Sequence, residues 1–360
     1  MAATPISQVV CPRCGANFDP KLDLQYCGTC GADLGPVSLP PISLSSGQLD
    51  DSSRDTLRAK DPLLGEILDA RYKILESIGQ GGMGKVYLVE HQQMGKKMAM
   101  KLLHRELASN RDIARRFRRE ALAISRLTSP HTVQVFDFGQ GAYGMYLVME
   151  LLRGEDLGKL IYREEKLTLA RTIDLLSQAA TALEEAHAQG VVHRDLKPEN
   201  LFITQAHNGS EHLKILDFGL AKLQSAANEE TGHGRLLGTP YYMSPEQIRG
   251  GDIDARADIY AMGALFHKML TGEPPYKAES PLGVLSRHIS DPIPKLRDKL
   301  PGVHSGAQRL LESLLAKDPN KRPKDVKEVK RMLQALALEV ETPSPPEKEP
   351  EPEEPVPALP

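Results

Sequence analysis

The stretch His-Arg-Asp-Leu-Lys-Pro-Glu-Asn, which begins at His193, gathers side chains suited to acid–base and metal chemistry. It places a carboxylate at Asp195, an ammonium group at Lys197 and a carboxamide at Asn200. Pro198 prevents a helix through this stretch. Because apolar residues flank it on both sides, we expect a tight loop that holds polar groups between two short strands.

A second carboxylate, Asp217, ends an apolar, strand-like run that begins at Leu213. Two carboxylates and a carboxamide near one point suit a divalent cation and a hydroxyl group that must lose its proton. A single loop of this kind can arise by chance. The interpretation therefore depends on whether the rest of the chain can bind a nucleotide.

Gly79, Gly81 and Gly84 form the pattern Gly-x-Gly-x-x-Gly between two strand-like segments. Glycines let the backbone N–H groups of a hairpin loop approach phosphate oxygens without clashes from Cβ atoms. The pattern also occurs in Rossmann folds, but there it leads into a helix, whereas strand-like residues follow it here. A Walker A loop is excluded because no Gly-Lys-Ser/Thr sequence ends the loop. The pattern favours a hairpin that covers phosphates.

Lys101 lies inside the apolar run 98–103, where its charge would be costly without a partner. A surface lysine is the usual alternative, but the apolar flanks favour a buried, paired side chain. Residues 109–127 have a helical pattern with one apolar face, and Glu120 adjoins that face. We expect Glu120 to turn inward and pair with Lys101.

Strand-like segments dominate residues 72–149, and helical segments dominate the chain after residue 156. The helices that apolar periodicity predicts span residues 168–189, 257–270, 282–288, 307–315 and 326–338. The second of these is almost entirely apolar, so we expect it to be a buried central helix. The sequence thus predicts an α+β architecture in which a small β-rich half precedes a larger helical half.

All four cysteines lie near the N-terminus, in two Cys-x-x-Cys-Gly motifs made by Cys11, Cys14, Cys27 and Cys30. Each motif can present two thiolates on one side of a tight turn, and two motifs can complete a tetrahedral zinc site. Two disulfides or a redox-active dithiol are the alternatives, but no signal peptide indicates an oxidising compartment. We expect a zinc ribbon over residues 8–35 that folds on binding Zn²⁺. Its partner is not specified by the sequence.

The charge and the apolar runs of the chain argue against membrane and nucleic-acid partners. The 360 residues carry a formal net charge of -3, and no apolar run approaches the length that spans a bilayer. We therefore expect a cytoplasmic protein. Residues 36–68 lack sustained periodicity and predict a flexible linker, and the Pro- and Glu-rich residues 340–360 predict a disordered tail.

With these motifs in this order, the chain resembles eukaryotic-like protein kinases from about residue 72 to residue 338. The finer resemblance is to bacterial serine/threonine kinases. It rests on Gly-Met-Gly in the glycine-rich loop, Leu-Asp-Phe-Gly-Leu-Ala-Lys around Asp217, and Gly-Thr-Pro-Tyr-Tyr-Met-Ser-Pro-Glu after it. The resemblance implies a bilobal kinase domain over residues 69–339, with an N-lobe at 69–151 and a C-lobe at 152–339.

The resemblance also implies roles for individual residues. Asp195 would accept the proton of the substrate hydroxyl, and Lys197 would steady the transferred phosphoryl group. Asn200 and Asp217 would hold two Mg²⁺ ions. The residues that the resemblance places around ATP, in addition to Lys101 with its partner Glu120, are Ile78, Gly79, Gly81, Gly84, Val86, Ala99, Met149, Glu150, Leu152, Asp156 and Phe202.

Further positions resemble the parts that set substrate class and stability in serine/threonine kinases. Lys197 follows Asp195 by two residues, and Thr239 would contact both while shaping the pocket that follows the phosphoacceptor. Structural roles are implied for Glu246, which would form a buried ion pair with Arg322, and for Asp258, which would brace the backbone at His193.

Arg194 is a cation beside Asp195 that could pair with a phosphate. Thr231 lies in a polar, glycine-containing context and is the expected phosphorylation site, with Ser225 as the second choice.

The chain is thus expected to transfer the γ-phosphate of ATP, with Mg²⁺ or Mn²⁺, to Ser and Thr hydroxyls of protein substrates and of its own activation segment. Related kinases often activate in trans, so a homodimer is an expected partner. Two alternatives remain: a catalytically silent kinase-fold scaffold, and a binding protein that acts through the zinc ribbon. Loss of the lysine or of a metal-binding residue is usual in the first, and none is lost here.

Overall fold

The computed structural model describes residues 9–10, 17–18, 61–81, 84–103, 111–206, 208–218 and 240–341. The chain divides into two compact units, Met1–Asp61 and Pro62–Pro360. In the first unit, β1 (Val9–Val10) pairs antiparallel with β2 (Asn17–Phe18), so that Val9 lies opposite Phe18. The four cysteines lie outside the described residues, and the zinc ribbon stays a prediction.

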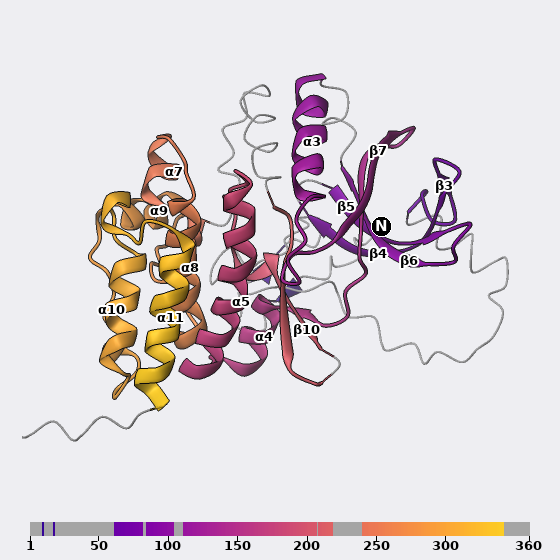
Figure 1. The fold of residues 1–360 in the computed structure, drawn as a ribbon. Coiled ribbons are helices and arrows are strands. Elements are labelled where there is room, and N and C mark those ends of the chain that lie inside the picture. Colours follow the sequence, from indigo (N-terminus) through magenta and orange to yellow (C-terminus); the bar gives the residue numbers. More distant parts are fainter. Residues whose placement is uncertain are drawn as a thin grey trace, which may run out of the picture. The chain divides into compact units, whose positions relative to one another are not determined.

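The second unit begins with a six-stranded antiparallel sheet (Figure 1), in the order β3-β4-β5-β6-β8-β7. Its strands are β3 (Ile67–Leu68), β4 (Tyr72–Gly81), β5 (Gly84–His91), β6 (Lys97–Leu103), β7 (Val135–Gly141) and β8 (Gly144–Met149). Helix α3 (Arg111–Ile124) lies beside this sheet. Its apolar face, with Ile113, Phe117, Ala121 and Ile124, is buried as the periodicity predicted.

The N-terminal end of this sheet starts earlier than the sequence suggested. Leu68 is buried in β3, which pairs with β4 through Leu68 opposite Tyr72, and Leu63 and Leu64 pack on the same apolar cluster. The predicted linker therefore ends in ordered residues. Its last apolar side chains supply contacts that a flexible segment would not make.

Helices dominate the rest of the unit, where α5, α8, α10 and α11 pack on one another (Figure 1). Helix α8 is buried along almost its whole length, which confirms the predicted central helix. Thr168 accepts a hydrogen bond from the N–H of Arg171 and caps α5. Gly190, with a φ of 75°, follows its end. The helices are α4 (Leu157–Glu164), α5 (Leu169–Ala188), α7 (Pro245–Arg249), α8 (Arg256–Thr271), α9 (Pro281–Ser290), α10 (Ser305–Leu314) and α11 (Val326–Glu341).

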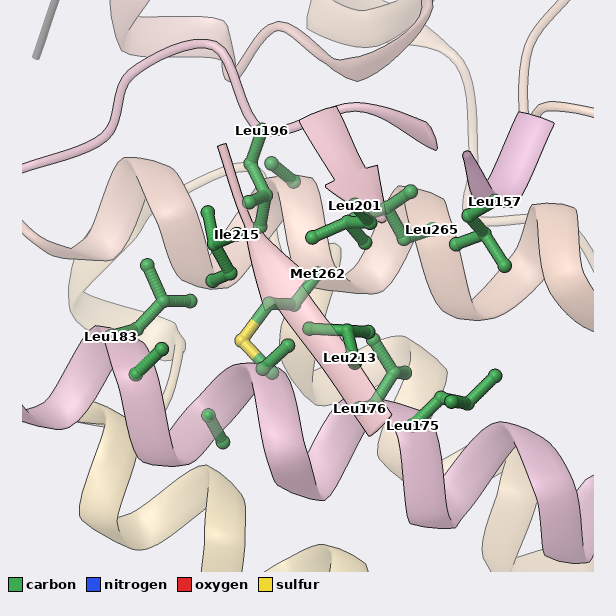
Figure 2. Close-up of a cluster of buried hydrophobic side chains, with 14 of the residues drawn as sticks. Leu157, Leu175, Leu176, Leu183, Leu196, Leu201, Leu213, Ile215, Met262 and Leu265 are labelled. Carbon is green, nitrogen blue, oxygen red and sulfur yellow. The ribbon is translucent and has the colours of Figure 1, made fainter. Parts of the chain in front are cut away.

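A second sheet, in the order β11-β10-β9, fixes the segment that carries the chemistry. It consists of β9 (Glu155–Asp156), β10 (Leu201–Gln205) and β11 (Glu211–Ile215). Figure 2 shows Leu201, Leu213 and Ile215 of this sheet among side chains of α5 and α8, such as Leu176 and Met262. The loop between α5 and β10 is therefore held at both ends by the apolar core.

Four short 3₁₀ helices complete the described part: Pro198–Asn200, Pro240–Tyr242 (η2), Leu296–Asp298 and Pro319–Lys321. Across the described ranges, no helix has the length and apolar character needed to cross a bilayer.

Candidate active site

The loop before β10 brings its three polar side chains together. Lys197 Nζ lies 2.9 Å from Asp195 Oδ2. The amide nitrogen of Asn200 donates to the backbone oxygen of Asp195 at 2.7 Å and lies 3.3 Å from Asp195 Oδ2. Because the nitrogen is the donor, the amide oxygen of Asn200 is the atom suited to a cation.

Asp217 is paired with Lys101, whose Nζ lies 2.6 Å from Asp217 Oδ2. Burial alone would raise the pKa of Asp217, but the charge and hydrogen bond of Lys101 outweigh it and hold that pKa below its ordinary value. Lys101 is itself only 9% exposed, as the apolar flanks predicted. Asp217 has a φ of 56°, a left-handed conformation that is uncommon for a non-glycine residue.

The expected pair between Lys101 and Glu120 is not formed in this structure, where Lys101 pairs with Asp217 instead. Glu120 is 8% exposed on α3, so it does turn inward, and its charge acts on the guanidinium of Arg194. The sequence indicated that Lys101 needs a buried anion. It could not indicate which of two carboxylates, one on a helix and one after a strand, lies nearer.

Asp258 at the start of α8 holds the backbone of the loop. It is 1% exposed and accepts hydrogen bonds from the N–H groups of His193, at 2.9 Å, and Arg194, at 2.8 Å. His187 Nε2 lies 2.7 Å from the same carboxylate. Burial would raise the pKa of Asp258, yet the hydrogen bond and charge of His187 keep it below its usual range. His187 carries no motif and was not singled out from the sequence.

The ring of His193 connects the loop to the strand that ends at Asp217. Its Nε2 lies 2.8 Å from the backbone oxygen of Leu216, and its Nδ1 accepts the N–H of Asp195 at 3.2 Å. The backbone N–H of Leu216 also donates to the oxygen of Asn200 at 2.8 Å. These bonds keep the two carboxylate-bearing segments side by side.

The glycine-rich hairpin connects β4 to β5, and residues 82 and 83 within it lie outside the described residues. A Cβ atom at Gly84 would lie 2.0 Å from the backbone oxygen of Leu102, whereas one at Gly81 would meet no described atom within 4 Å. Gly84 is therefore required by the close approach of β5 to β6. The sequence pattern predicted only the phosphate-binding role of Gly84 and gave no sign of this packing requirement.

The side chains expected around the adenine come from several strands. Ala99 and Met149 face each other in the β6–β8 register and are buried, and Val86 and Leu152 pack against the same apolar cluster. Ile78 is 45% exposed. Of the others, Gly79 faces Val86 across the β4–β5 hairpin, and Phe202 pairs in register with Asp156.

Two acidic residues near this cluster already have partners. Asp156 caps α4 by accepting the N–H of Lys159 at 2.9 Å. Glu150 Oε1 accepts the N–H of Gln134 at 2.8 Å and lies 2.6 Å from Lys214 Nζ. The Glu150 side chain thus ties the segment after β8 to β11.

Arg322 and Glu246 form a bidentate pair, with N–O distances of 2.7 Å and 2.8 Å. Burial would raise the pKa of Glu246, but the hydrogen bonds and charge of Arg322 lower it.

Arg194 is partly buried, and this burial lowers the pKa of its guanidinium. The regulatory candidates Ser225, Thr231 and Thr239 lie outside the described residues.

Comparisons with known proteins agree with this geometry. The chain matches the protein kinase domain family over residues 72–335. It is 37% identical over 285 residues to the serine/threonine-protein kinase pkn3 of Myxococcus xanthus, covering 78% of this chain and 52% of the relative. It is also 36% identical over 266 residues to the serine/threonine-protein kinase PknA of Mycobacterium tuberculosis, covering 72% and 60%.

A solved structure gives the same result for the fold. The crystal structure of the Mycobacterium tuberculosis PknI kinase domain aligns with a TM-score of 0.61 and 27% identity, covering 75% of this chain and 98% of that one. The chain spans about half the length of the curated relatives it matches. The chain belongs to the protein kinase family, and its kinase domain is of the bacterial serine/threonine type.

Proposed function

We propose that this chain is an active kinase that transfers the γ-phosphate of ATP to Ser and Thr hydroxyls of proteins, including its own activation segment. The observation that supports this most strongly is the pair of neighbouring carboxylate–lysine contacts, Asp195 with Lys197 and Asp217 with Lys101. A non-catalytic fold has no need to hold two such pairs on segments that are hydrogen-bonded to each other.

The chain's own groups divide the work of an in-line transfer. Asp195 accepts or orients the proton of the acceptor hydroxyl, and Lys197 stabilises charge on the phosphoryl group. Lys101 contacts the α- and β-phosphates. Asn200 and Asp217 supply an amide oxygen and a carboxylate, which fit Mg²⁺ or Mn²⁺. That cation neutralises phosphate charge when bound.

The nucleotide is held by the apolar cluster and the hairpin. Val86, Ala99 and Phe202 enclose the adenine, and Glu150 and Leu152 offer backbone groups to its edge. Met149 occupies the gatekeeper position. Asp156 binds the ribose, and the β4–β5 hairpin covers the phosphates. The burial of Ala99 and Met149 in one cluster supports this placement.

Regulation belongs to the same proposal. A phosphate on Thr231, or on Ser225, would pair with Arg194, whose partly buried guanidinium would gain a charged partner. Thr239 would contact Asp195 and Lys197. Two copies of the chain could phosphorylate each other, and we place this reaction in the cytoplasm.

The cysteines support a separate zinc-ribbon unit. The antiparallel pair β1–β2 brackets Cys11 and Cys14 in the sequence, as expected for a turn that presents two thiolates. Metal analysis of the purified full chain should give one zinc per chain, and Cys27→Ser should lower that content.

The kinase proposal is tested by incubating the full chain with Mg-ATP and mapping phosphorylation by mass spectrometry. Asp217→Asn should abolish phosphate incorporation, and the matched control Asp298→Asn, at an exposed position, should not. A scaffold would show no incorporation in the wild-type protein. Equal incorporation by wild type and Asp217→Asn would refute the catalytic assignment.

A further inference from the structure

His288 of α9 lies where the helical part meets the segment that follows Thr239. The 3₁₀ helix η2 (Pro240–Tyr242) packs against both α8 and α9. Its Tyr242 is buried in the main apolar cluster, and Tyr241 packs against that cluster. Any group that fixes η2 therefore also fixes the first described residues after Thr239, which begin at Pro240.

Three neighbours hold the His288 ring and its backbone. Tyr260 Oη lies 2.8 Å from His288 Nδ1, and the ring of Tyr276 packs edge-on with centroids 4.8 Å apart. Lys317 Nζ donates to the backbone oxygen of His288 at 2.8 Å and to Tyr276 Oη at 2.8 Å. The ring is fully buried. The His288 ring thus joins α9 to α8, through Tyr260, and to the loop between these helices, through Tyr276.

The protonation states of these groups can be assigned. Burial lowers the pKa of His288 to about 4, and the nearby Lys317 charge acts in the same direction. Burial raises the pKa of Tyr260 well above its ordinary value. Near neutral pH, Tyr260 is therefore the donor, Nδ1 the acceptor, and the imidazole proton is on Nε2.

Because Tyr260 occupies Nδ1, Nε2 is the ring atom that can interact with η2. Nε2 is buried and makes no hydrogen bond of standard geometry, but the backbone of Tyr241 acts on the ring as a weak acceptor and raises its pKa, against the larger effect of burial. A buried N–H is costly unless an acceptor faces it, so this contact favours one position of η2. An imidazole that only filled space could be replaced by an apolar side chain at lower cost.

We propose that His288 is a positioning residue for acceptor binding: held by Tyr260, it acts through Tyr241 to fix the segment that receives the residue after the phosphoacceptor. The inference rests on the proposed kinase function and deepens it. His288 touches neither nucleotide nor the reacting atoms, so its loss should affect the acceptor and leave the chemistry of ATP unchanged.

The test uses the full chain, saturating Mg-ATP and a degenerate peptide library with one central Ser or Thr. His288→Asn keeps an acceptor for Tyr260 but has no atom at the Nε2 position. We expect the KM for peptide to rise about fivefold, because the variant loses the weak polar contact with the backbone of Tyr241. The preference for the residue after the acceptor should also relax. The KM for ATP and peptide-independent ATP hydrolysis should stay the same.

His267→Asn is the matched control, because His267 is also a buried histidine of this part of the fold but bonds to the backbone oxygen of Glu273. It should leave the peptide KM unchanged. If His288→Asn does not fold, Tyr260→Phe removes the donor that holds the ring, keeps the aromatic volume, and should raise the peptide KM.

An unchanged peptide KM in the folded variant, or an equal rise in His267→Asn, would overturn the inference. An inactive wild-type protein would instead overturn the proposed function.

Discussion

At the scale of single residues, the same side chain can satisfy a motif and a packing requirement at once. The glycine pattern predicted a phosphate-covering loop, but the contact at Gly84 is with the backbone of β6. The residue types of the site were readable from the sequence because their spacing is fixed by local structure. Their partners were harder to predict. Lys101 pairs with Asp217 rather than Glu120, because the tertiary structure places Asp217 within reach of its ammonium group.

We expect Gly84→Ala to destabilise the protein by about 2 kcal/mol or more, because its Cβ would lie 2.0 Å from the oxygen of Leu102 and force β5 and β6 apart. Urea denaturation followed by circular dichroism measures this loss. Gly81→Ala is the control, since a Cβ there meets no described atom within 4 Å; its stability should change by less than about 1 kcal/mol. Equal losses in both variants would contradict this account of Gly84.

At the scale of elements, the helices that matched the sequence best are those whose burial pattern is regular. Helix α8 is nearly all apolar and α5 has a threonine cap with glycine after its end, so both were predicted within a residue or two. Strand β3 was missed because two residues carry too little periodicity. The contacts of His187 and His288 were also missed, since a lone histidine in a helix gives no sign of the element it will meet.

The link between α7 and the segment after α10 depends on the pair of Glu246 with Arg322, whose side chain is fully buried. Arg322→Met leaves a largely buried carboxylate without its partner, and we expect a loss of about 3 to 5 kcal/mol in the free energy of unfolding. Replacing Glu246 by Gln in the same chain should recover part of this loss. Chemical denaturation of the single and double variants measures both.

Arg309→Met provides the comparison, because its pair with Glu339 lies on the surface. Exposed pairs contribute little, so its effect should be below about 1 kcal/mol. Similar losses of stability from Arg309→Met and Arg322→Met would show that burial of the Arg322–Glu246 pair does not increase its contribution to stability.

At the scale of the whole molecule, the sequence predicted a β-rich part followed by a helical part, and this order is confirmed. The order was predictable because hydrophobic periodicity changes from 2 to 3.6 residues near residue 156. Hydrophobic periodicity does not predict which polar groups are buried in the core. Two of these, His267 and His288, are expected to make the stability of the protein depend on pH.

Burial lowers the pKa of both histidines from 6.5 to about 4. Between these values the unfolded chain binds protons that the folded chain does not, so the stability rises with pH through this window and is fully present above pH 6.5. Each histidine can account for roughly 3 kcal/mol. We expect the free energy of unfolding to fall between pH 6.5 and pH 4, as measured by denaturant titrations at half-unit steps. His267→Asn should reduce the slope, whereas an identical slope in the variant would exclude His267 as a source of acid sensitivity.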